Sequence, residues 1–115
     1  MSYMLLIVEP LGQRRTRSPD QGRGVYQRML EYAETLKAKG VLLASNSLRE
    51  AAVRINVRAG KPKVVDGPFT ESKEFIGGFF LLDCRTREQA LSLAGECPAA
   101  EWASIEVREV GPCYE

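Results

Sequence analysis

The sequence predicts an α+β domain in which an antiparallel β-sheet carries two α-helices on one of its faces. Six short segments have the composition of strands, and only two have apolar residues at helical spacing. The elements follow one another as strand-helix-strand, an inserted hairpin, and again strand-helix-strand. Two such units form the ferredoxin-like fold, and 115 residues suit one domain, which we place at residues 1–115.

The strand segments fall into two classes by their pattern of apolar residues. Residues 3–8 and 77–82 are apolar on both faces, which predicts cover on both sides. Residues 53–58 and 104–110 alternate apolar and polar residues, which predicts one solvated face. The strands are therefore expected at residues 3–8, 41–44, 53–58, 63–66, 77–84 and 104–110.

The first helix is expected near residues 22–39, because Val25, Met29 and Tyr32 recur at helical spacing. Residues 10–24 contain proline, glycine, serine and four arginines, and we interpret them as a solvated loop that precedes this helix.

The second helix is expected near residues 86–95, where Thr86 and Gln89 have the spacing of a capping box. Its inward residues are expected to be Ala90, Leu91 and Ala94.

The two doubly apolar strands predict a homodimer. Helices cover only one face of a ferredoxin-like sheet, so the apolar side chains on its other face need a second layer. One isologous contact with a second copy of the chain supplies that layer.

Histidine is absent from the chain, and this excludes several classes of site. A histidine triad, a histidine metal site and a histidine-ligated haem all require it. Cys84, Cys97 and Cys113 are widely spaced and odd in number, so they predict reduced thiols and no disulfide framework or zinc site. We expect no metal and no cofactor.

The charges are nearly balanced, with sixteen basic and fifteen acidic residues and a formal net charge of +1. No overall field favours an anionic membrane or direct nucleic-acid binding. The apolar residues 3–8 are too few to span a bilayer and lack the features of a signal peptide, so a cytoplasmic location is expected.

Residues 66–74 begin with Asp66-Gly67-Pro68-Phe69 and end in a charged stretch that contains Glu71, Lys73 and Glu74. Residues 76–79, with the sequence Ile-Gly-Gly-Phe, follow at the start of an expected strand. This segment resembles the signature of the YCII-related, or DGPF-domain, family, and both ends of the chain resemble that family's termini. The resemblance implies a dimeric α/β barrel of two ferredoxin-like halves with a pocket between the sheets. It implies enzymatic activity for a branch with a histidine–aspartate pair, which this chain cannot form, and an association with extracytoplasmic-function sigma factors for other members.

Asp66 is the candidate catalytic residue, at the point where a strand ends and a tight turn begins. An aspartate there accepts hydrogen bonds from the amides of its own turn. The alternative is a carboxylate at the mouth of the intersheet pocket, acting as a base or as an anchor for a ligand. Both roles can hold together.

Four further residues are candidate ligand-binding residues. Lys73 lies in a charged cluster with Glu71 and Glu74, which is either a solvated run or a site for an anionic ligand. Glu106 and Arg108 share one face of the last strand, and they form either an ion pair at the dimer interface or the polar floor of a pocket. Ser45, at the end of the second strand, either lines the same pocket or serves the loop.

The remaining candidates favour structural roles. Arg14, Arg15 and Arg17 form a basic patch without aromatic partners nearby, which we interpret as part of the solvated loop. Trp102, before the last strand, is expected to anchor the core or an interface.

The leading hypothesis is a homodimer that binds an unknown small molecule, with Asp66 assisting lyase, isomerase or hydrolase chemistry. The alternative is a non-enzymatic accessory protein that binds a transcription factor. An exposed apolar patch outside the dimer face would favour the accessory protein, whereas a pocket with convergent polar groups would favour the small-molecule site.

Overall fold

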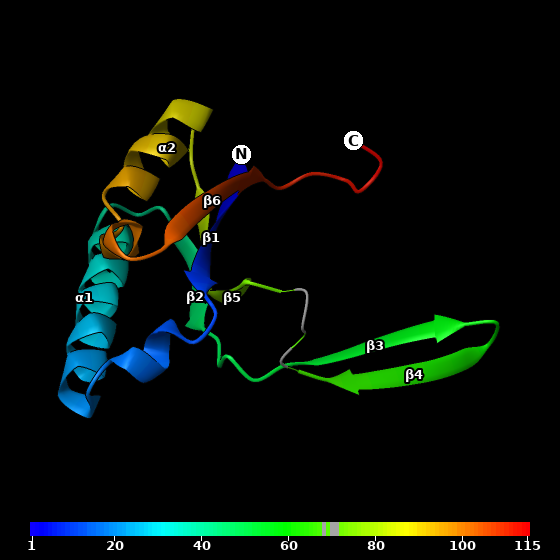
Figure 1. Ribbon diagram of the computed structural model, residues 1–115. Coiled ribbons are helices and arrows are strands. Elements are labelled where there is room, and N and C mark those ends of the chain that lie inside the picture. The colour runs from blue at the N-terminus through cyan, green and yellow to red at the C-terminus, as the bar shows by residue number, and fades with distance from the viewer. Residues whose placement is uncertain (68, 70–71) are drawn as a thin grey trace.

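The computed structural model describes residues 1–67, 69 and 72–115. A four-stranded antiparallel sheet has the strand order β2-β5-β1-β6, and α1 and α2 lie together on one side of it, as Figure 1 shows. This arrangement confirms the predicted ferredoxin-like α+β fold. The sheet consists of β1 (Ser2–Pro10), β2 (Leu42–Ser47), β5 (Glu74–Asp83) and β6 (Ser104–Glu109), and the helices are α1 (Pro19–Ala38) and α2 (Arg87–Gly95).

The core lies between this sheet and the two helices. Alternate residues of β1, which are Tyr3, Leu5 and Ile7, are buried against the helices, and Leu5 is completely inaccessible. The intervening residues Met4 and Leu6 are only half-buried, because no layer of the chain's own helices covers that face. The sheet therefore has one closed apolar face and one open apolar face.

Helix α1 begins earlier than the apolar spacing predicts. Ser18 and Gln21 form a reciprocal capping box, with the Gln21 amide donating to Ser18 Oγ at 3.2 Å and the Ser18 amide donating to Gln21 Oε1 at 2.8 Å. Pro19 takes the first helical position, where its missing N–H costs nothing. The prediction that residues 10–24 form a loop is thus wrong from Pro19 onward, because a strong cap outweighs two helical glycines.

Helix α2 matches its predicted range, with Thr86 as the N-cap that accepts from the Gln89 amide at 3.1 Å. Its inward face was predicted incorrectly at one position. Leu91 is 39% exposed, whereas Leu93 is buried in the core. A short 3-10 helix, η2 (Pro98–Glu101), then leads into β6.

The inserted hairpin is present, but it stands apart from the main sheet. β3 (Val53–Arg58) and β4 (Lys61–Asp66) pair only with each other among the described strands. Figure 1 shows this hairpin projecting from the side of the main sheet that faces away from the helices. We call residues 53–66 the arm.

All three cysteines are free thiols. Burial raises the pKa of the Cys97 thiol to about 11, and it also raises the pKa of Cys84, whereas Cys113 is exposed. Neither helix formed by the described residues combines the length and the apolar character needed to cross a membrane.

Candidate functional site

A cavity of about 340 Å³ lies between α1 and the closed face of the sheet. Small side chains create it: Ser45 and Ser47 of β2 and Gly78 of β5 leave space where larger residues would fill the layer. The register places Ser45 opposite Phe80 and Ser47 opposite Gly78 on the face that points toward the helices. Apolar and aromatic residues form most of its other walls, namely Ile7, Val25, Tyr26, Met29, Leu30, Phe80 and Trp102.

An ion pair between Glu9 and Arg14 forms part of the cavity wall. Arg14 Nε donates to Glu9 Oε1 at 3.0 Å, and an Arg14 terminal nitrogen donates to Glu9 Oε2 at 2.6 Å. Glu9 is only 5% exposed, so this two-bond geometry is what makes its burial tolerable. Glu9 continues the inward-facing row of β1, at the position where that row meets the cavity.

Arg14 is held in place by more than its carboxylate. It donates to the carbonyl oxygens of Leu48 at 2.7 Å and Gly77 at 3.1 Å, and its guanidinium lies 5.0 Å from the ring centre of Phe75. These bonds use four of the five N–H groups of the guanidinium. The η1 helix (Gln13–Thr16) positions Arg14, so the interpretation of this arginine as part of a solvated loop is wrong.

Gly77 is required for this ion pair. The β1–β5 register pairs Ile7 with Gly78 and Val8 with Ile76, which leaves Gly77 as the extra residue of a bulge. A β-carbon at Gly77 would lie 1.5 Å from Glu9 Oε2 and 2.6 Å from an Arg14 terminal nitrogen. The first glycine of the Gly-Gly pair thus makes room for the buried charges.

Trp102 borders the cavity and connects it to a group of charged residues. The guanidinium groups of Arg17 and Arg28 lie 5.8 Å and 5.3 Å from its ring centre. Arg28 also forms a two-bond ion pair with Glu101, with both distances 3.0 Å. Hydrogen bonds from Arg28 lower the pKa of the Glu101 carboxyl, and the same bonds raise the pKa of Arg28.

The residues selected from the sequence do not gather at this cavity. Ser45 lines it, although on the helix side of the sheet and not between two sheets. Asp66 is exposed at the last position of β4, and Lys73 is exposed just before β5, where its carbonyl accepts from Leu11 at 2.8 Å. Glu71 lies outside the described residues, as do Pro68 and Thr70 of the signature turn.

Glu106 and Arg108 lie on the open face of the sheet, as the alternation predicts. In the β1–β6 register Glu106 lies opposite Leu6 and Arg108 lies opposite Met4. The alternate residues of β6, Ile105 and Val107, pack against the core. Arg108 Nε donates to Glu106 Oε2 at 3.0 Å, so the ion pair forms within one chain. These two charges and the cavity lie on opposite faces of the sheet.

Sequence reasoning missed Glu9, Arg14 and Gly77, although the first of these carried a signal. Tyr3, Leu5, Ile7 and Glu9 fall on one face of a strand, and a carboxylate at the end of an apolar row needs a buried partner. The expected strand ended at Val8 and the expected loop began at Pro10, so Glu9 was given no role.

The polar groups of the cavity come from a few side chains of β1, β2 and the segment after β1. Within the part of the chain that the structure describes, no three histidine, cysteine, aspartate or glutamate side chains are placed to hold a metal ion. The cavity instead offers a carboxylate with lone pairs beyond those used by Arg14, two serines, and aromatic walls.

Comparison with known proteins places the chain in a family. The model of the YCII-related domain matches residues 1–113, and the protein therefore belongs to this family. An uncharacterized protein of Rhizobium meliloti (strain 1021) is 42% identical over 60 residues, and the match spans 50% of this chain and 48% of that relative. The alignment thus takes in about half the length of the relative.

Among solved structures, the chain resembles 5-chloro-2-hydroxyhydroquinone dehydrochlorinase from Burkholderia phenoliruptrix AC1100, in its complex with 2,5-dihydroxybenzoquinone. The TM-score is 0.57 at 17% identity, with 96% of this chain and 94% of that chain covered. At this identity the likeness supports the fold of the whole chain, and it does not transfer the activity.

Proposed function

We propose that the protein binds a small, largely apolar organic molecule in the cavity between α1 and the sheet. The observation that carries this proposal is the cavity of about 340 Å³, in whose mostly apolar lining the Glu9–Arg14 ion pair and the polar residues of β2 are the few polar groups. Pockets for small ligands have this composition, because apolar walls supply affinity and a few polar groups fix orientation.

The walls favour a planar ligand that carries a hydroxyl group. Tyr26 and Trp102 offer ring surfaces, and the Glu9 oxygens can accept a hydrogen bond from a ligand hydroxyl. A structure of the same fold holds 2,5-dihydroxybenzoquinone, which makes this compound a reasonable first probe.

We also propose that the protein is a homodimer formed through the open faces of two sheets. Met4, Leu6 and Val8 are half-buried there, beside the Glu106–Arg108 pair. Asp66-assisted lyase, isomerase or hydrolase chemistry, with Lys73, Glu106 and Arg108 as ligand contacts, is a proposal for the space between two copies. It is separate from the cavity within each chain.

The second candidate function is an accessory protein that binds a transcription factor such as an extracytoplasmic-function sigma factor. The observation that favours it is the exposed apolar side of the arm, where Ile55 is 68% exposed and Val64 is 62% exposed. Such a surface is typical of a site that binds another protein.

A binding experiment with a matched pair of variants tests the cavity. We expect 2,5-dihydroxybenzoquinone, or a member of a panel of small hydroxylated aromatics, to raise the thermal midpoint of the protein, since a ligand of the native state adds about 2.7 kcal/mol at a hundred times its dissociation constant. Ser45→Leu should fill the cavity and abolish this shift, whereas Ser92→Leu, on the exposed side of α2, should preserve it. Equal binding by both variants would place the ligand elsewhere.

A further inference from the structure

The arm has one apolar side that the described residues of its own chain leave exposed. In the β3–β4 register Val53, Ile55 and Val57 lie opposite Asp66, Val64 and Pro62, so these side chains share one face of the hairpin. The exposures of Val53, Ile55, Val57 and Val64 are 61%, 68%, 57% and 62%. We call this set of residues, with Pro62, the apolar arm face.

The opposite side of the arm is basic and suits water. It carries Arg54, Arg58, Lys61 and Lys63, with Lys61 directly opposite Arg58. Burying several like charges on one surface is costly, so this side is the solvated one. The arm is therefore expected to contact a partner with its apolar arm face and to leave its basic side in solvent.

Two backbone hydrogen bonds and one cation–π contact define the root of the arm. The Leu48 amide donates to the Gly77 carbonyl at 2.9 Å, and the Gly67 amide donates to the Ala52 carbonyl at 2.8 Å. The Arg54 guanidinium lies 3.7 Å from the ring centre of Phe69. The Gly67–Ala52 bond and the Arg54–Phe69 contact hold the two ends of the arm close together, and the Leu48–Gly77 bond ties the segment before the arm to β5.

The whole chain exposes more surface than a compact monomer of its size. Its accessible surface is 8105 Å² for 12.8 kDa, whereas compact monomers of this mass expose about 6,300 Å². Its radius of gyration is 16.1 Å, compared with about 13 Å for a compact domain of this length. The excess of about 1,800 Å² is twice what each partner buries in a standard interface, about 800 Å².

We propose that the arm extends over a second copy of this chain and packs its apolar arm face against that copy. Figure 1 shows the arm projecting on the open side of the main sheet, and the second sheet of the proposed homodimer would lie on that same side. Packed sheets lie about 10 Å apart, and strands of six residues span about 20 Å, so the arm is long enough to cross the gap and lie along the other copy. A two-stranded hairpin is marginally stable by itself, and this contact would stabilise it.

The second copy fits this surface better than a transcription factor does. The arm and the open sheet face lie on the same side of the molecule (Figure 1), so a single isologous contact with a second copy would cover both the open sheet face and the apolar arm face. A separate partner for the arm would leave the open sheet face to be covered by another contact. The inference rests on the proposed homodimer and is independent of any ligand in the cavity.

The test uses two single substitutions at adjacent positions of β3 that face opposite ways. Ile55→Lys places a charge on the apolar arm face, and Asn56→Lys places the same charge on the basic side. Sedimentation of the full chain over a range of concentrations measures the dimer dissociation constant. We expect Ile55→Lys to raise it by about a hundred-fold or more, because each dimer contains two such sites, and Asn56→Lys to change it by less than about five-fold.

Hydrogen exchange separates loss of the contact from loss of the fold. In Ile55→Lys we expect the amides of β1 and β5 to stay protected while those of β3 and β4 exchange quickly. A monomeric parent protein would overturn both the homodimer and the arm inference. A dimeric parent whose dissociation constant is unchanged by Ile55→Lys would overturn the arm inference alone and assign the apolar arm face to a different protein.

Discussion

The first strand of the main sheet and the arm have similar sequence patterns but opposite environments. β1 places Tyr3, Leu5 and Ile7 on one face at a period of two, and β3 places Val53, Ile55 and Val57 in the same way. The first set is buried at 4% exposure or less, whereas each member of the second set is more than half exposed. The difference comes from the helices, which cover β1 and do not reach the arm (Figure 1).

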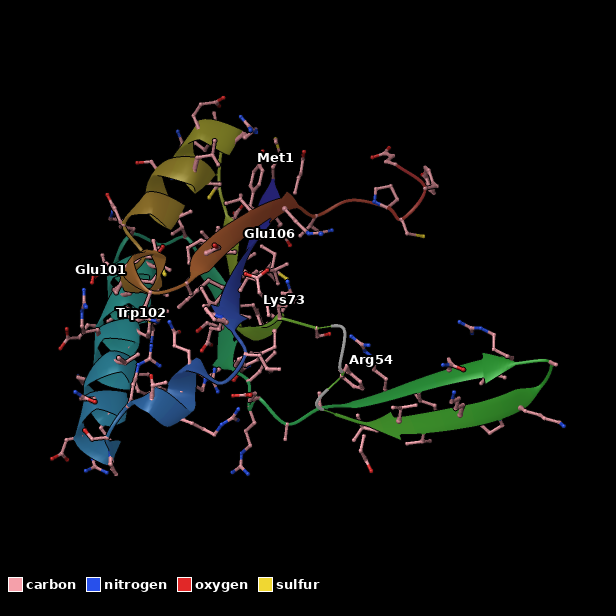
Figure 2. The ribbon with its side chains drawn as sticks, viewed as in Figure 1. Met1, Arg54, Lys73, Glu101, Trp102 and Glu106 are labelled. Carbon is pink, nitrogen blue, oxygen red and sulfur yellow. The ribbon has the colours of Figure 1, made fainter. Side chains whose placement is uncertain are left out.

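This comparison shows that alternation in a sequence identifies which face needs cover but not what provides it. Figure 2 shows the same contrast in side chains, which crowd between the helices and the main sheet and stand apart along the arm. Burial of an aliphatic side chain stabilises by about 2 kcal/mol only when another layer removes it from water. The aliphatic side chains of the arm therefore contribute this stabilisation only when another molecule covers them.

Truncating one aliphatic residue in each region should give the largest difference. Leu5→Ala is expected to cost about 4 kcal/mol of unfolding free energy, because Leu5 is fully inaccessible and its removal leaves a void. Ile55→Ala should cost less than about 1 kcal/mol when measured on dilute, monomeric protein, since little of this side chain is buried there. Urea unfolding at several protein concentrations measures both.

The concentration dependence provides the control for this pair. The loss from Leu5→Ala should be the same for monomer and dimer, whereas the loss from Ile55→Ala should grow in concentrated protein. A large loss from Ile55→Ala in dilute protein would mean that the arm already packs against its own chain.

Adding a single methyl group should have a smaller effect that again depends on the region. Gly77→Ala is expected to cost about 3 kcal/mol, because the new β-carbon overlaps Glu9 and forces apart the buried ion pair. Gly24→Ala adds the same group to α1 where nothing lies within 4 Å, and it should stabilise by up to about 1 kcal/mol through helix propensity. Thermal unfolding followed by circular dichroism compares them, and similar midpoints would contradict the assigned role of Gly77.

The sequence predicted the fold well because its elements carry local signals. The β3 range and the N-cap of α2 were predicted correctly, since alternation and the Thr86–Gln89 spacing act within a few residues. The start of α1 was wrong because residues 10–24 were interpreted as a loop from their proline, glycine, serine and arginine content, and the capping box that begins at Ser18 was not used.

The cavity could not be predicted in the same way, because its parts come from distant segments. Arg14 contacts Leu48 and Gly77, which are 34 and 63 residues away in the chain. Only the fold brings these three residues together. From composition, Arg14 could not be distinguished from the other arginines of the expected loop. Asp66 had the stronger sequence signal, yet in one chain it lies at the root of the arm, outside the set of residues that line the cavity.

The exposed ion pair of Arg28 and Glu101 should give the smallest effect and a distinct dependence on pH. Arg28 lowers the pKa of the Glu101 carboxyl, so the pair contributes stability above the ordinary carboxyl pKa of 4.5, and this contribution is lost as the pH falls through the lowered value. Both side chains are largely in water, so Glu101→Gln should shift the thermal midpoint at pH 7 by less than about 4 °C, and less in 1 M salt. Glu101→Gln keeps Arg28 beside Trp102 and removes only the titrating group. The difference between parent and variant should therefore shrink as the pH is lowered below about 4.5. Thermal unfolding from pH 7 to pH 3 measures this difference, and parallel profiles for the two proteins would show that the pair does not contribute to stability.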